Sequence, residues 1–219
     1  MIRESARNLA AGEGTMLDSV RTSYVGDYAQ AIATALHDAA ASDRSGKPVA
    51  LDEVVRWAAV AARRAHDAGN KLMFVGNGGS ATTASHMATD YNKNGNLRTL
   101  SLNDSSMLTC LGNDYSFADV FAKQVEFHAC KGDLLVAISS SGKSPNILNA
   151  ARTARTLDCT ILTMSGFDPD NPLRQEGDMN IYLPSDFYGI VEIGHLALCH
   201  AILDFSMEQD GRGAALRRD

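Results

Sequence analysis

Apolar residues recur along the chain at two different periods. From about Met16 to Ala41 they follow the spacing of one face of a helix, which predicts a long amphipathic helix. The positions that carry this pattern are Leu17, Val20, Tyr24, Tyr28, Ile32 and Leu36. The polar segment 43–48 interrupts it, and a second helix is predicted from about Leu51 to Ala68, where Gly69-Asn70 ends it.

From residue 71 onward, short apolar runs alternate with helical patterns. Strands are predicted near Lys71–Val75, Thr99–Leu102, Leu134–Ile138, Thr160–Met164 and Asn180–Leu183. Helices are predicted near Ser80–Asn92, Ser105–Leu111, Phe117–His128, Pro145–Thr156 and Tyr188–Met207. The run Leu134–Ile138 is apolar at every position, as a parallel strand covered on both faces requires. The alternation predicts an α/β fold with a doubly wound, flavodoxin-like, five-stranded parallel sheet flanked by helices, preceded by two N-terminal helices.

The chain has 219 residues, of which 45% are apolar, and it shows neither an internal repeat nor a low-complexity linker. We therefore expect one domain over residues 16–210, which includes the N-terminal helices in 16–69. The small and polar residues 1–15 predict a flexible lead-in, and residues 211–219 a flexible tail.

Charge and cysteine spacing exclude several classes of protein. The net charge is −6 and no Lys/Arg run is present, so a nucleic-acid partner is not expected. No apolar run approaches the ~20 residues that span a bilayer, and the first residues lack the apolar core of a signal peptide. We expect a cytoplasmic protein with no membrane contact. The cysteines form no CxxC pair, so neither disulfides nor a cysteine zinc site is predicted. We expect buried free thiols at Cys110, Cys130, Cys159 and Cys199.

Two turns follow predicted strands and precede predicted helices. The first, Gly76–Ser80, reads Gly-Asn-Gly-Gly-Ser. Glycines allow a sharp turn, and the free amides of a helix start attract an anion. The second, Ser139–Asn146, reads Ser-Ser-Ser-Gly-Lys-Ser-Pro-Asn and gathers hydroxyls and backbone amides, as a phosphate site would. The alternative for the first segment is a tight turn that binds no ligand, and for the second a serine-rich helix cap. Neither turn matches GxxxxGK[ST] or GxGxxG, so no nucleotide cofactor is expected.

Two predicted helices carry residues suited to catalysis or metal binding. His86 and Asp90 are four residues apart and share a helix face, although a solvated pair would look the same. On the last helix, Glu192 and His200 share another face. Two histidines and two carboxylates form a plausible nitrogen and oxygen site for a divalent metal such as zinc.

The two turns, together with the segment Gly112-Asn113-Asp114-Tyr115, resemble the sugar-isomerase (SIS) domain family, and in particular its bacterial phosphoheptose isomerases. The likeness runs from about Met16 to Met207, with the motifs in the same order. It implies isomerisation of sedoheptulose 7-phosphate to a D-glycero-heptose 7-phosphate through an enediol. It also implies a homotetramer with sites at subunit interfaces, to which the apolar face of the N-terminal helix would contribute.

The resemblance also implies roles for individual residues. The phosphate cradle would be Ser139, Ser140, Ser141 and Ser144. The neighbouring substrate contacts would be Asn77, Gly78, Gly79, Ser80, Asn113, Asp114 and Glu192. Zinc, one ion per subunit, would be held by His86, Asp90, Glu192 and His200. Asp90 would act as the base and His200 as its acid/base partner.

Three departures from the family pattern stand out. Asp90 is one methylene shorter than the usual glutamate, which draws its carboxylate back by ~1.5 Å unless the pocket has moved. Glu192 stands where glutamine is usual; an alignment shifted by one residue would put Val191 there instead. Lys143 replaces a frequent asparagine and would either contact phosphate or point to solvent.

The leading hypothesis is therefore a phosphoheptose isomerase. The alternatives are an isomerase of another ketose phosphate and a non-catalytic SIS module that senses phosphosugars or binds a protein.

Overall fold

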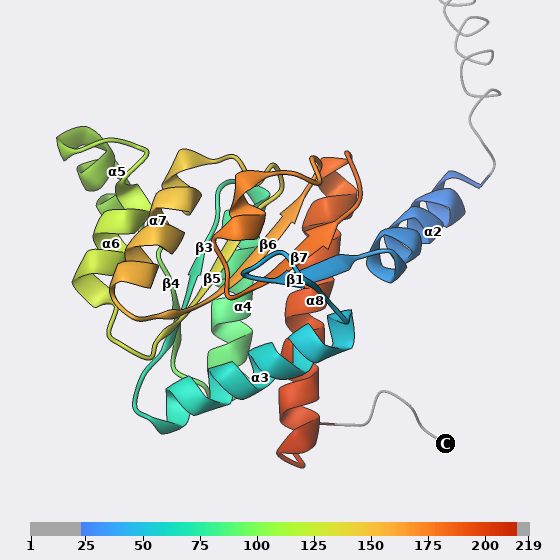
Figure 1. The fold of residues 1–219 in the computed structure, drawn as a ribbon, viewed down its shortest axis with the longest axis horizontal. Helices are drawn as coiled ribbons and strands as arrows, with labels where there is room; N and C mark the ends of the chain where they lie inside the picture. The colour runs from blue at the N-terminus through green and yellow to red at the C-terminus, as the bar shows by residue number, and fades with distance from the viewer. Residues whose placement is uncertain (1–22, 214–219) are drawn as a thin grey trace, which may run out of the picture. The chain divides into compact units, whose positions relative to one another are not determined.

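The computed structural model describes residues 23–213, and within them a seven-stranded sheet forms the centre of the fold (Figure 1). Its strands are β1 (Ala40–Asp43), β2 (Pro48–Val49), β3 (Leu72–Val75), β4 (Thr99–Ser101), β5 (Leu134–Ser139), β6 (Thr160–Gly166) and β7 (Met179–Leu183). They lie in the order β2-β1-β7-β6-β5-β3-β4. The strands from β4 to β7 run parallel in the doubly wound order, which confirms the predicted fold class.

Helices cover both faces of the sheet (Figure 1). Helices α3 (Leu51–Asp67), α4 (Gly79–Lys93) and α8 (Tyr188–Gln209) pack together on one face. Helices α5 (Ser105–Asp114), α6 (Val120–His128) and α7 (Pro145–Thr156) pack together on the other. A short 3₁₀ helix, η1 (Pro172–Gln175), follows β6. The predicted helices after residue 50 are all present, with ends shifted by a few residues.

The central strands are apolar throughout because both of their faces are buried. Met73 and Val75 of β3 belong to the core under α6 and α7. Leu72 and Phe74, which alternate with them, lie in the layer that contains residues of α3, α4 and α8. Successive side chains of a strand point to opposite faces, so a strand between two helix layers needs apolar residues at every position.

The segment after the first described helix differs from the sequence prediction. Helix α2 (Tyr24–His37) ends four residues before the predicted limit at Ala41. Residues 40–43 instead pair antiparallel with β7, and β2 adds a second antiparallel strand. The Asp43 carboxylate accepts hydrogen bonds from the backbone N–H groups of Ser45 and Lys47, which closes the hairpin turn. Helical periodicity concealed this edge hairpin because the strands are too short to show alternation.

The chain divides into two compact units, residues 1–34 and 35–219. The first unit contributes the described part of α2 before residue 35, where the rings of Tyr24 and Tyr28 stack at a centroid distance of 6.4 Å. The predicted lead-in, the helix start at Met16 and most of the predicted tail lie outside the described residues. The domain limits 16–210 stay a prediction.

Two expectations from composition need correction. Cys159 and Cys199 are buried, but Cys110 and Cys130 are exposed. Cys110 lies on the outer helix α5 and Cys130 in the loop after α6, so neither is covered by a helix layer. Helix α8 is long and apolar enough to cross a membrane by length and composition. Half of its apolar stretch is buried inside the fold, where α8 packs against α3 and α4. Burial in this helix layer explains its apolar character.

Candidate active site

The turn from β3 to α4 is built on glycines at which a side chain would either clash or strain the backbone. A Cβ at Gly76 would lie 2.5 Å from the backbone of Ser80, in the first turn of α4. A Cβ at Gly79 would lie 2.3 Å from the Glu192 carboxyl group. Gly78 has a positive φ of 55°, which a side chain would strain. The glycines thus allow a tight connection from β3 to α4, with Ser80 buried beneath the turn.

The turn from β5 to α7 is held by its own serines and backbone. Ser139 and Ser140 are buried, and the Gly142 N–H donates to both the carbonyl and the hydroxyl oxygen of Ser139, at 3.0 and 3.2 Å. The Ser139 and Ser144 hydroxyls lie 3.3 Å apart. Pro145 then opens α7 at a position where its missing N–H costs nothing.

The two turns enclose one polar cavity of about 140 Å³ at the carboxyl edge of the sheet. Its lining contains seven of the predicted site residues: Asn77, Ser80, Ser139, Ser140, Ser141, Ser144 and Glu192. The eighth lining residue, Tyr188, was not predicted from the sequence. Neither Lys nor Arg is among the lining residues. Hydroxyl donors in a concave turn suit a single phosphate group, and Glu192 supplies the one carboxylate of the lining.

The predicted contacts Asn113 and Asp114 lie elsewhere in this chain. Both are exposed in the last turn of α5, where the Asn113 amide donates to the Asp114 carboxylate at 2.9 Å. Neither lines the polar cavity. Helix α5 lies at the outer end of its helix layer (Figure 1), so a single chain does not bring these residues to the turns.

A second cavity of about 400 Å³ shares the Glu192 side chain with the polar cavity. It runs between α4 and α8 and is lined by Gly79, Thr82, Thr83, His86, Glu192, Ile193 and Leu196. It therefore leads from the serine turns towards the histidines, a path that suits an extended ligand with a phosphate at one end.

His86, Asp90 and His200 form a cluster between α4 and α8. Their nearest donor atoms all lie within 4.8 Å of one another. The Nε2 atoms of His86 and His200 are 3.2 Å apart, and Asp90 Oδ2 lies 3.5 Å from His86 Nε2 and 3.9 Å from His200 Nδ1. The histidine side chains are 50% and 36% exposed, so solvent or a ligand can reach them.

This donor set fits a divalent metal ion. Ligands bound ~2.1 Å from a tetrahedral zinc are separated from one another by about 3.4 Å, close to the shorter separations in the cluster. Two imidazoles and one carboxylate leave a fourth position for water or substrate, as in catalytic zinc sites. The fourth predicted ligand, Glu192, is not in the cluster, because its carboxyl group lies against Gly79.

His195 has a structural environment. It is buried, and its Nε2 lies 3.1 Å from the Ser165 carbonyl oxygen at the end of β6. Burial lowers the pKa of its imidazole to about 4, so the ring is neutral at neutral pH and donates this hydrogen bond. His195 thereby fixes α8 to the sheet between the cavity residue Glu192 and the cluster residue His200.

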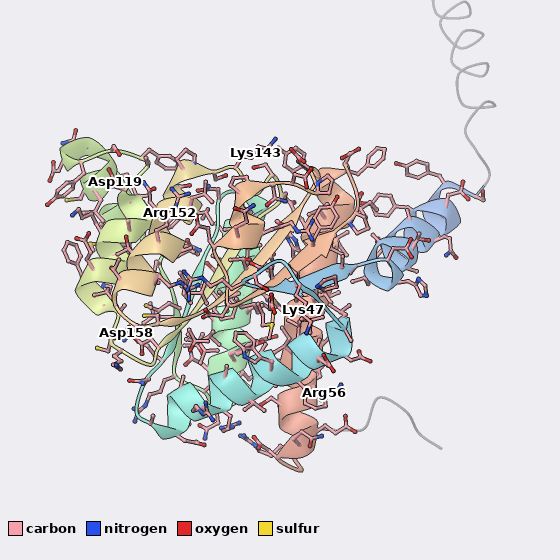
Figure 2. The ribbon with its side chains drawn as sticks, viewed as in Figure 1. Lys47, Arg56, Asp119, Lys143, Arg152 and Asp158 are labelled. Carbon is pink, nitrogen blue, oxygen red and sulfur yellow. The ribbon has the colours of Figure 1, made fainter. Side chains whose placement is uncertain are left out.

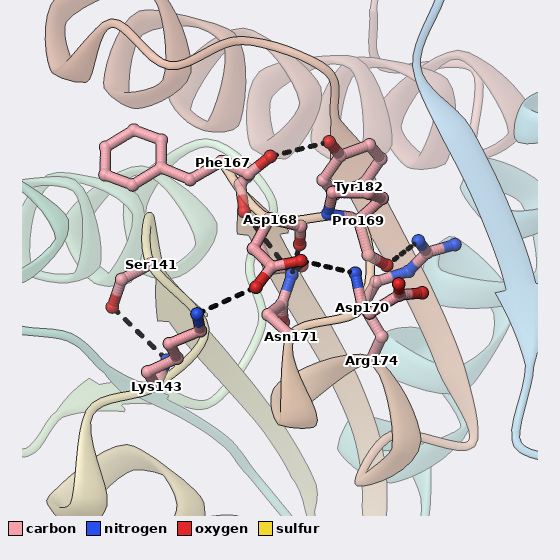
Figure 3. A network of polar contacts seen from close by, with 11 residues as sticks. Ser141, Lys143, Phe167, Asp168, Pro169, Asp170, Asn171, Arg174 and Tyr182 are labelled. Carbon is pink, nitrogen blue, oxygen red and sulfur yellow. Dashed lines mark hydrogen bonds and ion pairs between the residues drawn. The ribbon is translucent and has the colours of Figure 1, made fainter.

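Lys143 forms an ion pair at the rim of the second turn. Its Nζ lies 2.7 Å from Asp168 Oδ2, in the loop after β6 (Figure 3). This bond lowers the pKa of the Asp168 carboxyl group. Figure 2 shows Lys143 at the upper edge of the molecule and Asp158 at its lower left. Lys143 follows the end of β5, whereas Asp158 precedes the start of β6, so this rim lies at the carboxyl ends of the strands. Lys143 thus has a partner that neither sequence alternative included.

The sequence reasoning missed two residues that support the second turn. Asn146 exchanges two hydrogen bonds with Asn77 across the turns, each 2.9 Å long. Asn171, labelled in Figure 3, is buried, and a Cβ at Gly142 would lie 1.9 Å from its Oδ1. Asn146 follows Pro145 in the motif, but the sequence offers no signal that identifies its partner.

Comparison with known proteins agrees with this geometry. The family model of the SIS domain matches residues 27–166. The phosphoheptose isomerase of Citrifermentans bemidjiense is 37% identical over 146 residues, 64% of this chain and 76% of that protein. The chain belongs to the SIS-domain family.

Solved structures of phosphoheptose isomerases share the fold of this chain. The phosphoheptose isomerase from Neisseria gonorrhoeae superposes with a TM-score of 0.71 at 29% identity, over 84% of this chain and 96% of that one. The enzyme from Francisella tularensis gives 0.73 at 26% identity, over 88% and 98%. The family assignment from sequence is confirmed, and the chain is an isomerase of the phosphoheptose isomerase type. This favours the enzymatic hypothesis over the non-catalytic one.

Proposed function

We propose that the chain interconverts sedoheptulose 7-phosphate and a D-glycero-heptose 7-phosphate through an enediol. The observation that carries this proposal is the path from a phosphate-sized polar cavity to a histidine–aspartate cluster. Relatives named phosphoheptose isomerase support the seven-carbon substrate.

The serine turn would anchor the phosphate and thereby fix the sugar. Ser139, Ser140, Ser141 and Ser144 offer hydroxyl groups, and the backbone amides at the start of α7 complement them. Asn77 and Ser80 form the opposite wall, and Gly79 lines the adjoining cavity. Gly78 and Gly79 would contribute to substrate binding through the backbone of this turn. Glu192 lies between the two cavities, where its carboxylate would accept hydrogen bonds from sugar hydroxyls. Anchoring a distant phosphate converts binding energy into correct placement of the reacting carbons.

In the reaction, Asp90 would remove the proton from the carbon next to the carbonyl group, and the electron pair would form the enediol double bond. The carbonyl oxygen would take up a proton and the neighbouring hydroxyl would lose one, both through His200. Asp90 would then return its proton to the other carbon. No atom is gained or lost, as an aldose–ketose isomerisation requires.

We propose zinc, one ion per subunit, as the metal of the cluster. His86, Asp90 and His200 would hold it, and Glu192 would join them only after its carboxyl group leaves Gly79. Because a metal-bound carboxylate is a poorer base, Asp90 would move away from the ion or share the base role with His200 during proton transfer. When bound, zinc polarises the substrate carbonyl group and stabilises the negative charge of the enediolate.

We also propose a cytoplasmic homotetramer with sites at subunit interfaces. The exposed positions of Asn113 and Asp114 support this assembly, because these residues can contact the sugar only at a neighbouring subunit's site. Exposed Tyr115 and Phe117 follow them and provide apolar surface for such a contact.

The test is turnover of sedoheptulose 7-phosphate by the purified chain, with bound metal measured by elemental analysis. Loss of the base or its partner removes proton transfer, so we expect Asp90→Asn and His200→Ala each to lower kcat by ~10²–10⁴-fold. Both variants should also lose metal.

The Glu192→Gln variant is the matched comparison for the carboxylate roles. It should raise KM more than it lowers kcat, because the amide keeps the shape of the side chain near the sugar. A loss of kcat in Glu192→Gln, with normal turnover in Asp90→Asn, would transfer the base role to Glu192. Normal turnover in both Asp90→Asn and His200→Ala would overturn the residue assignments.

A further inference from the structure

The side chains of Asn77 and Asn146 form a reciprocal amide pair between the two turns of the polar cavity. Each Nδ2 donates to the Oδ1 of the other residue, at 2.9 Å in both directions. Asn146 is 2% exposed. All the hydrogen-bonding atoms that face each other across this contact are therefore satisfied. Asn77 is half-buried, so solvent is excluded chiefly from the Asn146 side of the pair.

The pair lies beyond the last backbone link between the strands that feed the turns. Strands β3 and β5 pair up to Val75 and Ala137. Past that point, within residues 23–213, the two hydrogen bonds of the amide pair are the only side-chain hydrogen bonds between residues 76–80 and 139–146. The spacing of the two turns above the sheet edge thus depends on this contact.

Each member of the pair also positions serines of the cavity. The Asn77 carbonyl accepts the Ser80 N–H at 3.0 Å and so begins α4. Asn146 lies in the first turn of α7, close after Ser144. A change at Asn146 would therefore move Ser80 relative to Ser139 and Ser144, although Asn146 itself does not line the cavity.

We propose that Asn146 is a positioning residue for phosphate binding, which acts through Asn77 by holding the two turns at the spacing that one phosphate group requires. This inference rests on the proposed phosphate site, but not on the proposed sugar or on proton transfer. It can therefore be tested with inorganic phosphate alone.

The experiment measures the Kd for inorganic phosphate by calorimetry, together with Tm, for the full chain and its variants. Asn146→Leu keeps the approximate volume and leaves the Asn77 amide without a partner. We expect a rise in the phosphate Kd of about tenfold, the effect of one buried hydrogen bond. The KM for sedoheptulose 7-phosphate should rise by the same factor, with a smaller change in kcat.

Asn149→Leu is the matched control on the same helix. The Asn149 amide also crosses to another element, where it donates to the Ala118 carbonyl at 3.0 Å, but it is remote from the cavity. It should lower Tm without changing the phosphate Kd. The double variant Asn77→Leu/Asn146→Leu should regain Tm relative to Asn146→Leu, because no buried amide is left unpaired, while phosphate binding stays weak.

The outcomes separate the two proposals. An unchanged phosphate Kd in folded Asn146→Leu overturns the positioning role, whatever the isomerase activity. Phosphate binding that falls as expected in a chain without isomerase activity supports the positioning role and overturns the proposed reaction. A wild-type chain that binds no phosphate overturns both.

Discussion

The serine turn and the histidine–aspartate cluster differ in how the fold builds them. The turn Ser139–Ser144 is continuous in sequence, and the hydrogen bonds of its serine hydroxyl groups stay within it. The segment after β6 also holds its backbone, through the N–H groups of Gly166 and Leu173. The cluster joins α4 to α8, and His86 and His200 are 114 positions apart in the sequence. Its side chains are partly exposed, whereas Ser139 and Ser140 are buried.

This difference follows from what each region would bind. A phosphate is held by many neutral donors fixed by local backbone geometry, and a serine-rich turn supplies them at one strand end. Proton transfer and metal binding need titratable groups that converge from different directions, and only helix packing brings those together. We therefore expect phosphate binding at the turn to be lost through changes in local geometry. Metal binding and proton transfer at the cluster should be lost when α8 is displaced.

The largest effect should come from Gly142→Ala. Gly142 has a φ of 61°, and a Cβ would lie 1.9 Å from Asn171 Oδ1, so the turn must move. Strain of ~2–3 kcal/mol corresponds to about a 100-fold weaker binding of inorganic phosphate, measured by calorimetry. Metal binding at the cluster should not change.

Gly46→Ala is the control for Gly142→Ala, because Gly46 also has a positive φ, but a Cβ there would meet no atom within 4 Å. It reports the cost of the backbone angle alone and should leave phosphate affinity intact. Equal phosphate affinity in Gly142→Ala and the wild-type chain would show that the turn is not the anion site.

An intermediate effect should come from the buried imidazole on α8. The folded pKa of His195, about 4, lies below the unfolded value of about 6.5, so the unfolded chain binds more protons between these values. The contribution of the neutral His195 imidazole to the free energy of unfolding is fully present above pH 6.5. This contribution, about 3 kcal/mol, is lost as the pH falls towards 4. Denaturant unfolding across this range should show a flatter pH dependence for His195→Gln.

His37→Gln serves as the control for His195→Gln, since the His37 side chain is exposed. It should keep the wild-type pH dependence of the unfolding free energy. If His195→Gln retains that dependence as well, protonation of the buried imidazole does not cause the pH dependence of the unfolding free energy.

The smallest effect should come from Lys143→Asn. The ion pair with Asp168 is exposed, and such pairs contribute up to ~1 kcal/mol, so phosphate affinity should change by at most about fivefold. Phosphate titrations at low and high salt provide the measurement. A larger loss that disappears at high salt would make Lys143 a phosphate ligand and weaken the contrast between the two regions.

Local sequence predicted most of the elements because their periodicity is strong. The fully apolar run in β5 identified a central strand. The glycine turn after β3 and the serine turn after β5 identified the two walls of the polar cavity. The antiparallel hairpin at the sheet edge escaped prediction, since four- and two-residue strands carry no readable period. The pair of His86 and Asp90 was visible as an i, i+4 spacing, but its contact with His200 was not a property of either helix alone.

The sequence by itself determined the order of strands and helices after residue 50, the two strand-end turns and the residue types that a phosphate and a metal would need. Short-range sterics and hydrophobic periodicity fix these features within a few residues. The tertiary structure decided which side chains meet: Asn77 with Asn146, Glu192 with Gly79 rather than with the cluster, and His200 with His86. Such contacts depend on how helices pack across the sheet, and packing joins residues that no local pattern relates.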